Sequence, residues 1–416
     1  MTTISITGPN SEKDRTDCTE KRAASSEGLD STIDILSISM KKERQSKRRR
    51  STEDDNRYPD VVVSAVSADQ PSSLQVVQPI FADNYVPTPG DISNLLGKID
   101  DHHSSQQVGA ALEALKQLNE WSKKEEIRSI VLEIFFCFGG IARVLDFLNS
   151  TMQNRNCVIG STEFLSFILS FRWNALEVNK NLAIEMAKMI VRCNGIQVLL
   201  RASHEYTVGN RISSATKHIW IALGRTINGD STREVVDKKE TIICILNHAT
   251  NCISKLEEIG KQQDNGWTMD VFQAVLYAMA NTIKDDRIGR EELKQTNIVP
   301  VCLKALKNDC LIRNEDVVMF TLGTLAICSR KKALTKKKEF EQLLPTLVHC
   351  IGYFRENNQI ISFVLSLLEI ACGKLPKKSM EDAGVLEAIS AAILKPGPTS
   401  EETKEKARSI MRAILK

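Results

Sequence analysis

The chain has 416 residues, of which 42% are hydrophobic and 26% are charged. This composition is ordinary for a protein that buries a core, and it excludes a collagen-like or wholly disordered chain. Because 55 Lys and Arg face 52 Asp and Glu, the net charge is only +3, so no global charge drives the chain onto nucleic acid or anionic lipid.

Cysteine usage and the amino terminus both favour a soluble intracellular protein. The 11 cysteines include no Cys-x-x-Cys pair and lie mostly in apolar helical runs, which is typical of a reducing compartment. The first residues are polar where a signal peptide requires an apolar run. The most apolar stretch, residues 127–148, is interrupted by charged residues and is too polar to cross a bilayer. We expect residence in the nucleus and cytoplasm, without a membrane span.

Residues 1–88 predict a disordered, charged amino-terminal arm, because they cannot bury enough apolar surface to offset the entropy lost on ordering. A basic cluster in this arm resembles a nuclear localisation signal, which works as an extended peptide laid along an acidic receptor groove. The alternative is a solvated polar tract. The basic residues of the cluster are Lys41, Lys42, Arg44, Lys47, Arg48, Arg49 and Arg50.

Two hydroxyl residues follow this basic cluster directly. Ser51 comes after three arginines, as at sites of basophilic kinases, and acidic residues stand behind Ser51 and Thr52, as at sites of acidophilic kinases. Phosphorylation at Ser51 or Thr52 would place about two negative charges beside the cluster and weaken its binding to an acidic receptor.

Residues 89–416 form the second predicted domain, and its periodicity is helical. Asp91 stands where a helix N-cap is expected, and apolar residues then recur at i, i+3, i+4 and i+7 in nearly every long segment. No stretch offers several strands with period 2. The domain is therefore predicted to be all-α.

Six blocks of one type recur in this domain, each small or apolar at its ends and variable at its fourth position. The last four fourth positions are 43, 45 and 43 residues apart. A second mark, a small or polar residue before an apolar helix, keeps phase with the blocks and predicts a left-handed turn at Gly140, Gly195, Asn297 and Gly384. The blocks are residues 114–119, 222–227, 278–283, 321–326, 366–371 and 409–414, with a weaker copy at 166–171.

This pattern resembles the armadillo repeat, whose unit has three helices and an Ala-Leu-x-Asn-Leu-Ala stripe on the third. The resemblance implies a right-handed α-solenoid of about six or seven units. Only Asn281 keeps the Asn of the family stripe, and HEAT repeats are the nearest alternative. In armadillo proteins that carry nuclear import cargo, a Trp stands four residues before each stripe Asn. Here only Tyr277 before Asn281 approaches that pair.

The fourth positions share one phase in successive units, so we expect them to line a concave face that binds an extended or helical protein segment. Tyr277, one helical turn before Asn281, is expected to stack on this partner. The alternative is that these side chains only cover exposed helix surface. The predicted partner-binding residues are Arg225, Tyr277, Asn281, Thr324 and Glu369.

Nothing in the sequence predicts catalysis or a cofactor. It contains no nucleophile elbow, no phosphate-binding Gly-rich loop and no His-Glu-x-x-His. Cys244, His248 and Cys252 share a helix face at a spacing that zinc accepts, but buried helix positions produce the same spacing, and we interpret them as core. The basic run at 330–338 is interpreted as a solubilising loop, with an acidic partner or a nucleic-acid backbone as alternatives.

The function predicted from the sequence is a non-enzymatic scaffold that binds a protein partner. One alternative is a nuclear transport adaptor, similar to importin-alpha, whose basic arm inhibits its own groove. Another is an RNA-associated helical repeat protein. The absence of interleaved aromatic residues argues against nucleic-acid binding.

Overall fold

The structure is a computed structural model that describes residues 85–170, 177–207, 214–227, 235–236, 238–260, 266–309, 311–393 and 400–416. The chain divides into two units, residues 1–85 and 86–416, and the description below concerns the second. The basic cluster of the arm, together with Ser51 and Thr52, lies outside the described residues. The localisation signal and the phosphorylation sites therefore stay predictions.

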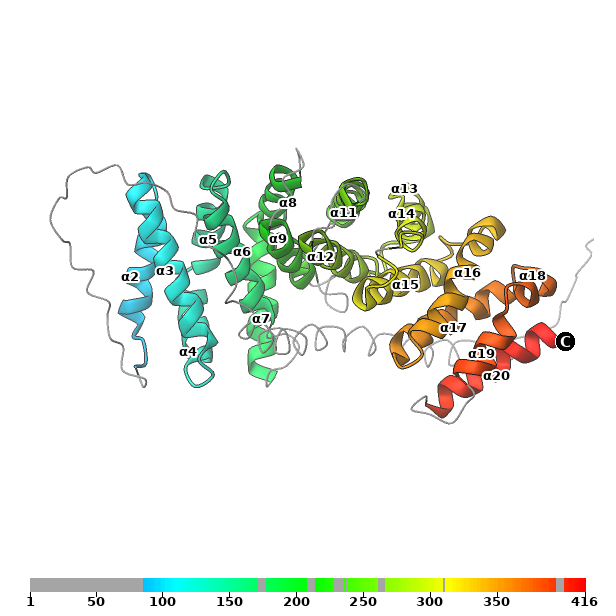
Figure 1. Ribbon diagram of the computed structural model, residues 1–416. Helices are drawn as coiled ribbons and strands as arrows, with labels where there is room; N and C mark the ends of the chain where they lie inside the picture. Colours follow the sequence, from blue (N-terminus) through cyan, green and yellow to red (C-terminus); the bar gives the residue numbers. More distant parts are fainter. Residues whose placement is uncertain are drawn as a thin grey trace, which may run out of the picture. The chain divides into compact units, whose positions relative to one another are not determined.

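The described residues form helices and no strand, which confirms the all-α prediction. Their helices fall into two rows and four connecting helices, which can be followed in Figure 1. The block row, which carries the six-residue blocks, consists of α3 (Ser105–Lys123), α6 (Arg155–Leu169), α9 (Ser214–Thr226), α12 (Gly266–Thr282), α15 (Glu315–Arg330), α17 (Asn358–Cys372) and α20 (Glu401–Leu415). The flanking row consists of α2 (Pro89–Asp100), α5 (Gly140–Ser150), α8 (Gly195–Thr207), α11 (Lys239–Gly260), α14 (Ile298–Ala305), α16 (Lys337–Tyr353) and α19 (Val385–Ala392). The connecting helices are α4 (Arg128–Cys137), α7 (Glu177–Arg192), α13 (Arg290–Gln295) and α18 (Lys377–Asp382).

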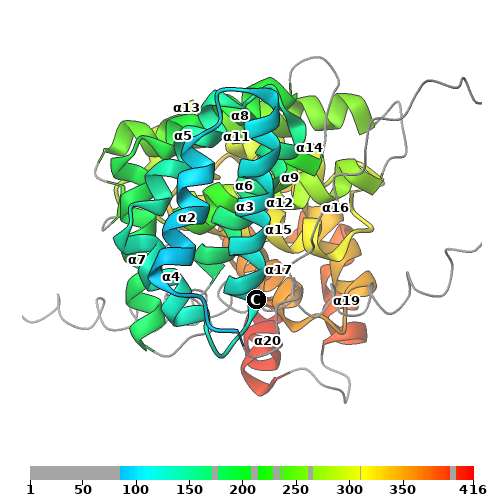
Figure 2. The same ribbon diagram turned by 90° about the vertical axis from the view of Figure 1, so that its left-hand side faces the viewer.

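Helix packing follows the order of the chain. Each block-row helix packs on the next, from α3 to α20, and each flanking helix packs on the next, from α2 to α19. Each flanking helix also packs on the block-row helix that follows it in each pair, such as α8 on α9. Figure 2 views this series from its amino-terminal side, where α2, α3 and α4 lie in front. The hydrophobic core is therefore a series of local cores between neighbouring helices.

The first described helix begins three residues earlier than its sequence signal suggested. Thr88 is the N-cap of α2, and Pro89 occupies the first helical position, where its missing N–H costs no hydrogen bond. The Asp91 carboxylate accepts a 2.7 Å hydrogen bond from the Thr88 backbone N–H, completing a capping box. Asp91 is thus the third residue of the helix, and its prediction as the N-cap was wrong.

Left-handed residues precede four flanking helices, as the second sequence mark predicted, but two of them lie one position earlier. Gly139 has φ 68° and Asn194 has φ 59°, directly before Gly140 and Gly195. Glycine at 140 serves packing instead, because a Cβ there would lie 2.2 Å from a ring carbon of Phe135. At Asn297 (φ 53°) and Gly384 (φ 75°) the left-handed residue is the predicted one.

The middle of the block row is buried on all sides. Every residue of α15 from Val317 to Ser329 is buried, although this stretch contains Thr321 and Thr324. A threonine is tolerated in such an interior when its hydroxyl bonds to the carbonyl one turn earlier, as Thr321 does to Val317 at 2.6 Å. Thr282 of α12 does the same to Ala278 at 2.6 Å. Small, internally satisfied side chains thus let these helices approach closely.

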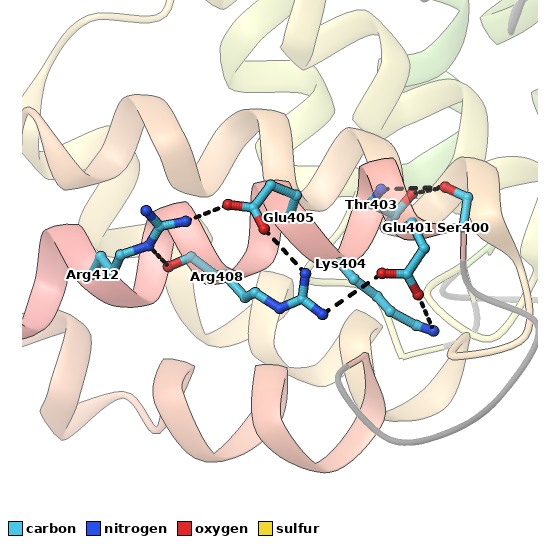
Figure 3. Close-up of polar contacts among 7 residues, drawn as sticks. All are labelled: Ser400, Glu401, Thr403, Lys404, Glu405, Arg408 and Arg412. Carbon is cyan, nitrogen blue, oxygen red and sulfur yellow. Dashed lines mark hydrogen bonds and ion pairs between the residues drawn. The ribbon is translucent and has the colours of Figure 1, made fainter.

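The last helix carries a ladder of charged residues along its outer face, shown in Figure 3. Glu401 pairs with Lys404 at 2.8 Å, and Glu405 pairs with Arg408 at 3.0 Å and with Arg412. The opposite face of α20 buries Ala407, Ile410 and Ile414, and α20 packs on α17. The helix thus has a charged exposed face opposite its apolar buried face.

Candidate partner-binding face

Each of the six blocks lies within a block-row helix or at its carboxyl-terminal end, so the sequence pattern marks one row of helices. The blocks at 114–119, 321–326, 366–371 and 409–414 fall inside α3, α15, α17 and α20, and those at 222–227 and 278–283 close α9 and α12. The block row is therefore the candidate partner-binding face.

Two of the predicted partner-binding residues bind the preceding helix of the block row. Asn281 of α12 is 1% exposed, and its side-chain Nδ2 donates a 3.2 Å hydrogen bond to the carbonyl of Gly224 in α9. Arg225 of α9 is half-buried, and its Nη1 donates a 2.5 Å hydrogen bond to the carbonyl of Ser166 in α6. The fourth residue of these two blocks thus joins one block-row helix to the preceding block-row helix by a hydrogen bond.

Tyr277 also joins neighbouring block-row helices, through the packing of its ring. Its side chain is 4% exposed, and its ring lies edge-to-face with Phe320, with 6.0 Å between the ring centroids. A Cβ on Gly224 would lie 2.7 Å from two carbons of the Tyr277 ring, so α9 and α12 approach closely at this point. The ring is already packed between three block-row helices and presents almost no surface on which a partner could stack.

Thr324 and Glu369 differ completely in exposure. Thr324 is fully buried, and its hydroxyl has no hydrogen-bond partner among the described residues. Glu369 of α17 is exposed and forms a 3.4 Å ion pair with Lys406 of α20. The structure therefore does not bring the five predicted residues together on one open groove. Tyr277, Asn281 and Thr324 are closed in because the small residues of their blocks pack helix against helix. The partner-binding role predicted for these three is not favoured by their burial.

An open hollow of about 330 Å³ lies instead between α3 and α6, at the amino-terminal end of the block row. Its apolar part comes from Leu112, Leu115 and Ile159, and Gly160 keeps the α6 backbone close, since a Cβ there would meet Leu112 at 2.8 Å. The polar side chains around this hollow are Lys116, Asn119, Asn156 and Glu163.

Among these polar residues, Asn119 has a buried side-chain oxygen. Its Oδ1 atom is inaccessible to water and has no hydrogen-bond partner among the described residues. A buried amide oxygen without a donor costs free energy, so Asn119 lowers the stability of this end of the row in the described structure. Lys116, by contrast, already pairs with Glu113 at 2.6 Å on the exposed surface.

The block pattern does not predict this hollow, because it marks only the fourth position of each block. A different signal was present: Leu112, Leu115 and Asn119 occupy i, i+3 and i+7 on α3, and Asn156, Ile159 and Glu163 repeat that spacing on α6. Apolar and polar residues therefore alternate at helical spacing on the facing sides of both helices, which is compatible with a small groove between them.

A second hollow, of about 500 Å³, lies between α11 and α14 of the flanking row. Its lining is mainly neutral and polar, and includes Asn247, Asn251 and Asn297. At one end the Lys304 ammonium lies 2.5 Å from the carboxylate of Glu257, which is only 2% exposed. This pairing neutralises the cation, so the hollow offers no strong charge to a ligand.

The three residues at a zinc-like spacing lie on α11, where Cys252 is buried and Cys244 and His248 are partly buried. Burial raises the pKa of the Cys252 thiol to about 12 and also raises the pKa of Cys244. Burial, and then His204, lower the pKa of His248. In the part of the chain that the structure describes, no three His, Cys, Asp or Glu residues are arranged to hold a metal ion.

The basic run at 330–338 is divided between structure and solvent. Lys331 donates hydrogen bonds from Nζ to the carbonyls of Asp285 and Ile288, at 2.6 and 2.7 Å, and burial lowers its pKa. It therefore joins the connection after α15 to the one after α12. Lys332, Lys336 and Lys337 are exposed, which is compatible with a solubilising loop.

Comparison with known proteins adds no family to this description. No protein-family model matches the chain, and no curated protein matches it significantly. None of the described helices is both long and apolar enough to span a membrane.

Proposed function

We propose that the chain is an armadillo-like, non-enzymatic scaffold that binds a segment of a protein partner along its block row. The proposal includes the right-handed solenoid of about six or seven units implied by the resemblance. It is supported by the packing of neighbouring helices in chain order, by the common position of the six blocks, and by the left-handed residues before four flanking helices.

The observation that carries the proposal is the contrast within one row of equivalent helices. The row is closed around Tyr277 and Asn281 of α12 and Thr324 of α15, whereas an accessible, partly apolar hollow remains between α3 and α6. A partner segment would place an apolar side chain against Leu112 and Ile159. Arg225 and Glu369 remain partly accessible farther along the row and would orient a longer segment by charge.

Quantitative affinity purification followed by mass spectrometry tests this function. We would compare the full chain with the Ile159→Lys variant, which places a charge at the wall of the hollow. The matched control is Leu415→Lys, an exposed apolar residue on α20. The proposal expects one principal partner to be lost with Ile159→Lys by about tenfold or more and retained with Leu415→Lys.

A direct binding measurement then follows with the recovered partner, and Tm is measured for both variants. Equal recovery of every partner in the two variants, with unchanged Tm, would contradict binding at this hollow. Turnover of a substrate by the purified chain would contradict the non-enzymatic assignment. Nuclear and cytoplasmic residence is proposed from the basic cluster of the arm and is tested separately by replacing Lys47, Arg48, Arg49 and Arg50 with Ala.

A further inference from the structure

Two clusters of exposed lysines lie at the ends of neighbouring helices. One cluster stands where α16 begins, and the other stands around the connection from α17 to α18. Neither residues 330–338 nor residues 373–378 include an Asp or a Glu. The lysines are Lys336, Lys337 and Lys338 in the first cluster and Lys374, Lys377 and Lys378 in the second.

The helical hairpin of α16 and α17 brings the two clusters to one edge of the fold. The helices pack on each other and are joined by residues 354–357 alone, so they run antiparallel. Because α16 has 17 residues and α17 has 15, the start of α16 lies beside the end of α17. The six lysines are named here the basic edge.

Contacts between α15 and α17 support this arrangement independently. The side chain of Asn357, the N-cap of α17, donates a hydrogen bond to Glu315 at the start of α15. Farther along, a Cβ on Gly323 of α15 would lie 3.2 Å from the ring of Phe363 of α17. The two helices therefore run parallel and end on the same side, where α15 leads into α16 and α17 leads into α18.

Most of the basic edge is not neutralised by the fold. The Lys336 ammonium lies 3.9 Å from the Glu339 carboxylate, and the Lys337 ammonium lies 3.6 Å from the Glu341 carboxylate. The other four lysines form no ion pair with a residue of the described chain. Like charges gathered on one surface raise the local positive potential and attract anions.

Solubility alone does not require such a segregated surface. The ladder of α20 alternates acidic and basic residues that pair with one another, as Glu401 does with Lys404 and Glu405 does with Arg408. An interspersed pattern of this kind is enough to keep a surface soluble. The basic edge instead holds one sign of charge, which indicates binding of an anion.

Carboxylates border the basic edge and limit the length of an anion that fits it. Exposed Glu381 and Asp382 end α18 on one side. On the other side, the connection after α12, to which Lys331 donates two hydrogen bonds, exposes Asp286. A nucleic acid has regularly spaced phosphates that would continue over these carboxylates, whereas a peptide can confine its acidic residues to the edge.

The basic edge also lacks the side chains that would hold a base or enter a bilayer. No aromatic residue occurs at 330–338 or 373–378 on which a base could stack. Leu334 and Leu375, the larger apolar residues of these stretches, are buried and cannot insert into a membrane. Charge is therefore the main feature that a partner can recognise, and it favours an acidic peptide.

We propose that the basic edge binds an acidic segment of a partner protein, in which Asp or Glu side chains face both lysine clusters. Each ammonium group is carried on a flexible side chain and can meet a carboxylate without a fixed geometry. The inference goes beyond the proposed function, because none of the six lysines lines the hollow between α3 and α6.

Two fluorescent peptides of about 12 residues serve as probes, and each spans about 40 Å when extended. One alternates Glu with Ser, and the other alternates Gln with Ser. Binding is measured by fluorescence anisotropy at low salt. Because the basic cluster of the arm would itself attract acidic peptides, the full-length chain carries Gln at the basic positions of that cluster. Protection of lysines from acetylation, read by peptide mass mapping, locates the bound peptide.

The Glu peptide should bind at least about tenfold more tightly than the Gln peptide and should protect Lys338 and Lys377. Replacing Lys338, Lys377 and Lys378 with Gln should weaken its binding about tenfold or more without changing Tm, because all three residues are exposed. The matched control removes three exposed lysines from other helices and should change binding by less than about twofold. It replaces Lys98, Lys123 and Lys307 with Gln.

Four outcomes would overturn the proposal. Equal loss of affinity in the control variant would show that only net charge matters. Bound Glu peptide without protection of Lys338 and Lys377 would place the acidic segment elsewhere. Tighter binding of a duplex DNA or a single-stranded RNA of equal charge, lost when the three lysines are replaced, would assign the edge to nucleic-acid phosphates. No binding of the Glu peptide at low salt would leave the lysines a solubilising role alone.

Discussion

Similar six-residue blocks occur in the middle and at the amino-terminal end of the block row. The helices pack closely in the middle, whereas they leave a hollow at the amino-terminal end. In the middle, Tyr277 fills the space left by Gly224, and Asn281 bonds across to α9. At the amino-terminal end, the small residue Gly160 brings α6 close to α3, but the helices leave a hollow lined by Asn119 and Ile159. The comparison teaches that the side chains of the blocks first supply the contact between neighbouring block-row helices. Where that contact is incomplete, a hollow remains.

Tyr277→Ala should give the largest effect, because it empties a buried site between three helices. We expect a loss of about 3 to 5 kcal/mol in the free energy of unfolding, as for other large buried aromatic residues. Urea denaturation followed by circular dichroism measures it. If Tyr277 were instead a groove residue that waits for a partner, the midpoint would stay near that of the unaltered chain.

Gly224→Ala tests the same contact from the other side. The added methyl group would lie 2.7 Å from the Tyr277 ring, so overpacking should cost about 1 to 3 kcal/mol. Gly352→Ala in α16 is the matched control, since a Cβ there meets nothing within 4 Å and alanine favours a helix. Equal changes in Tm for the two variants would show that α9 and α12 are not closely packed.

Two asparagines differ in one hydrogen bond between the middle and the amino-terminal end of the block row. Asn281→Leu removes the donor to the Gly224 carbonyl and should cost about 1 to 3 kcal/mol. Asn119→Leu removes a buried oxygen that has no partner in the described structure, so it should be neutral or stabilising. Denaturation of both variants in parallel measures the difference, and a reversed order would contradict the contrast between middle and end.

The all-α class was predictable from the sequence because helical periodicity depends on local apolar spacing. The blocks at 222–227 and 278–283 correctly marked equivalent helix positions. The exposure of their fourth residues was not predictable, because whether Asn281 faces solvent or Gly224 depends on how closely two helices approach. The hollow was missed for the same reason, since it depends on the separation of α3 and α6. The site residues outside the described chain, such as Ser51, stay predictions.

The smallest expected effect concerns the charged ladder of α20. A hydrogen bond from Lys404 lowers the pKa of Glu401, and one from Arg408 lowers the pKa of Glu405. Because their pKa values are depressed in the folded state, the stabilisation they add is present above the ordinary value of 4.5 and is lost as the pH falls through the folded-state values. The rate of amide hydrogen exchange in α20, corrected for the intrinsic rates, should therefore rise slightly as the pH falls below 4.5. Glu401→Gln with Glu405→Gln should abolish this dependence, and its persistence in that variant would assign it elsewhere.

Thiol labelling of two cysteine variants tests the central contrast most directly. Glu163→Cys places a thiol at the hollow, and Thr324→Cys places one in the fully buried part of α15. Peptide mass mapping follows alkylation at each position in the folded full-length chain, with the denatured chain as the reference for complete reaction. We predict rapid labelling at position 163 and protection at position 324 until the chain unfolds. Rapid labelling at both positions would show that the middle of the block row is an open groove and would contradict the account.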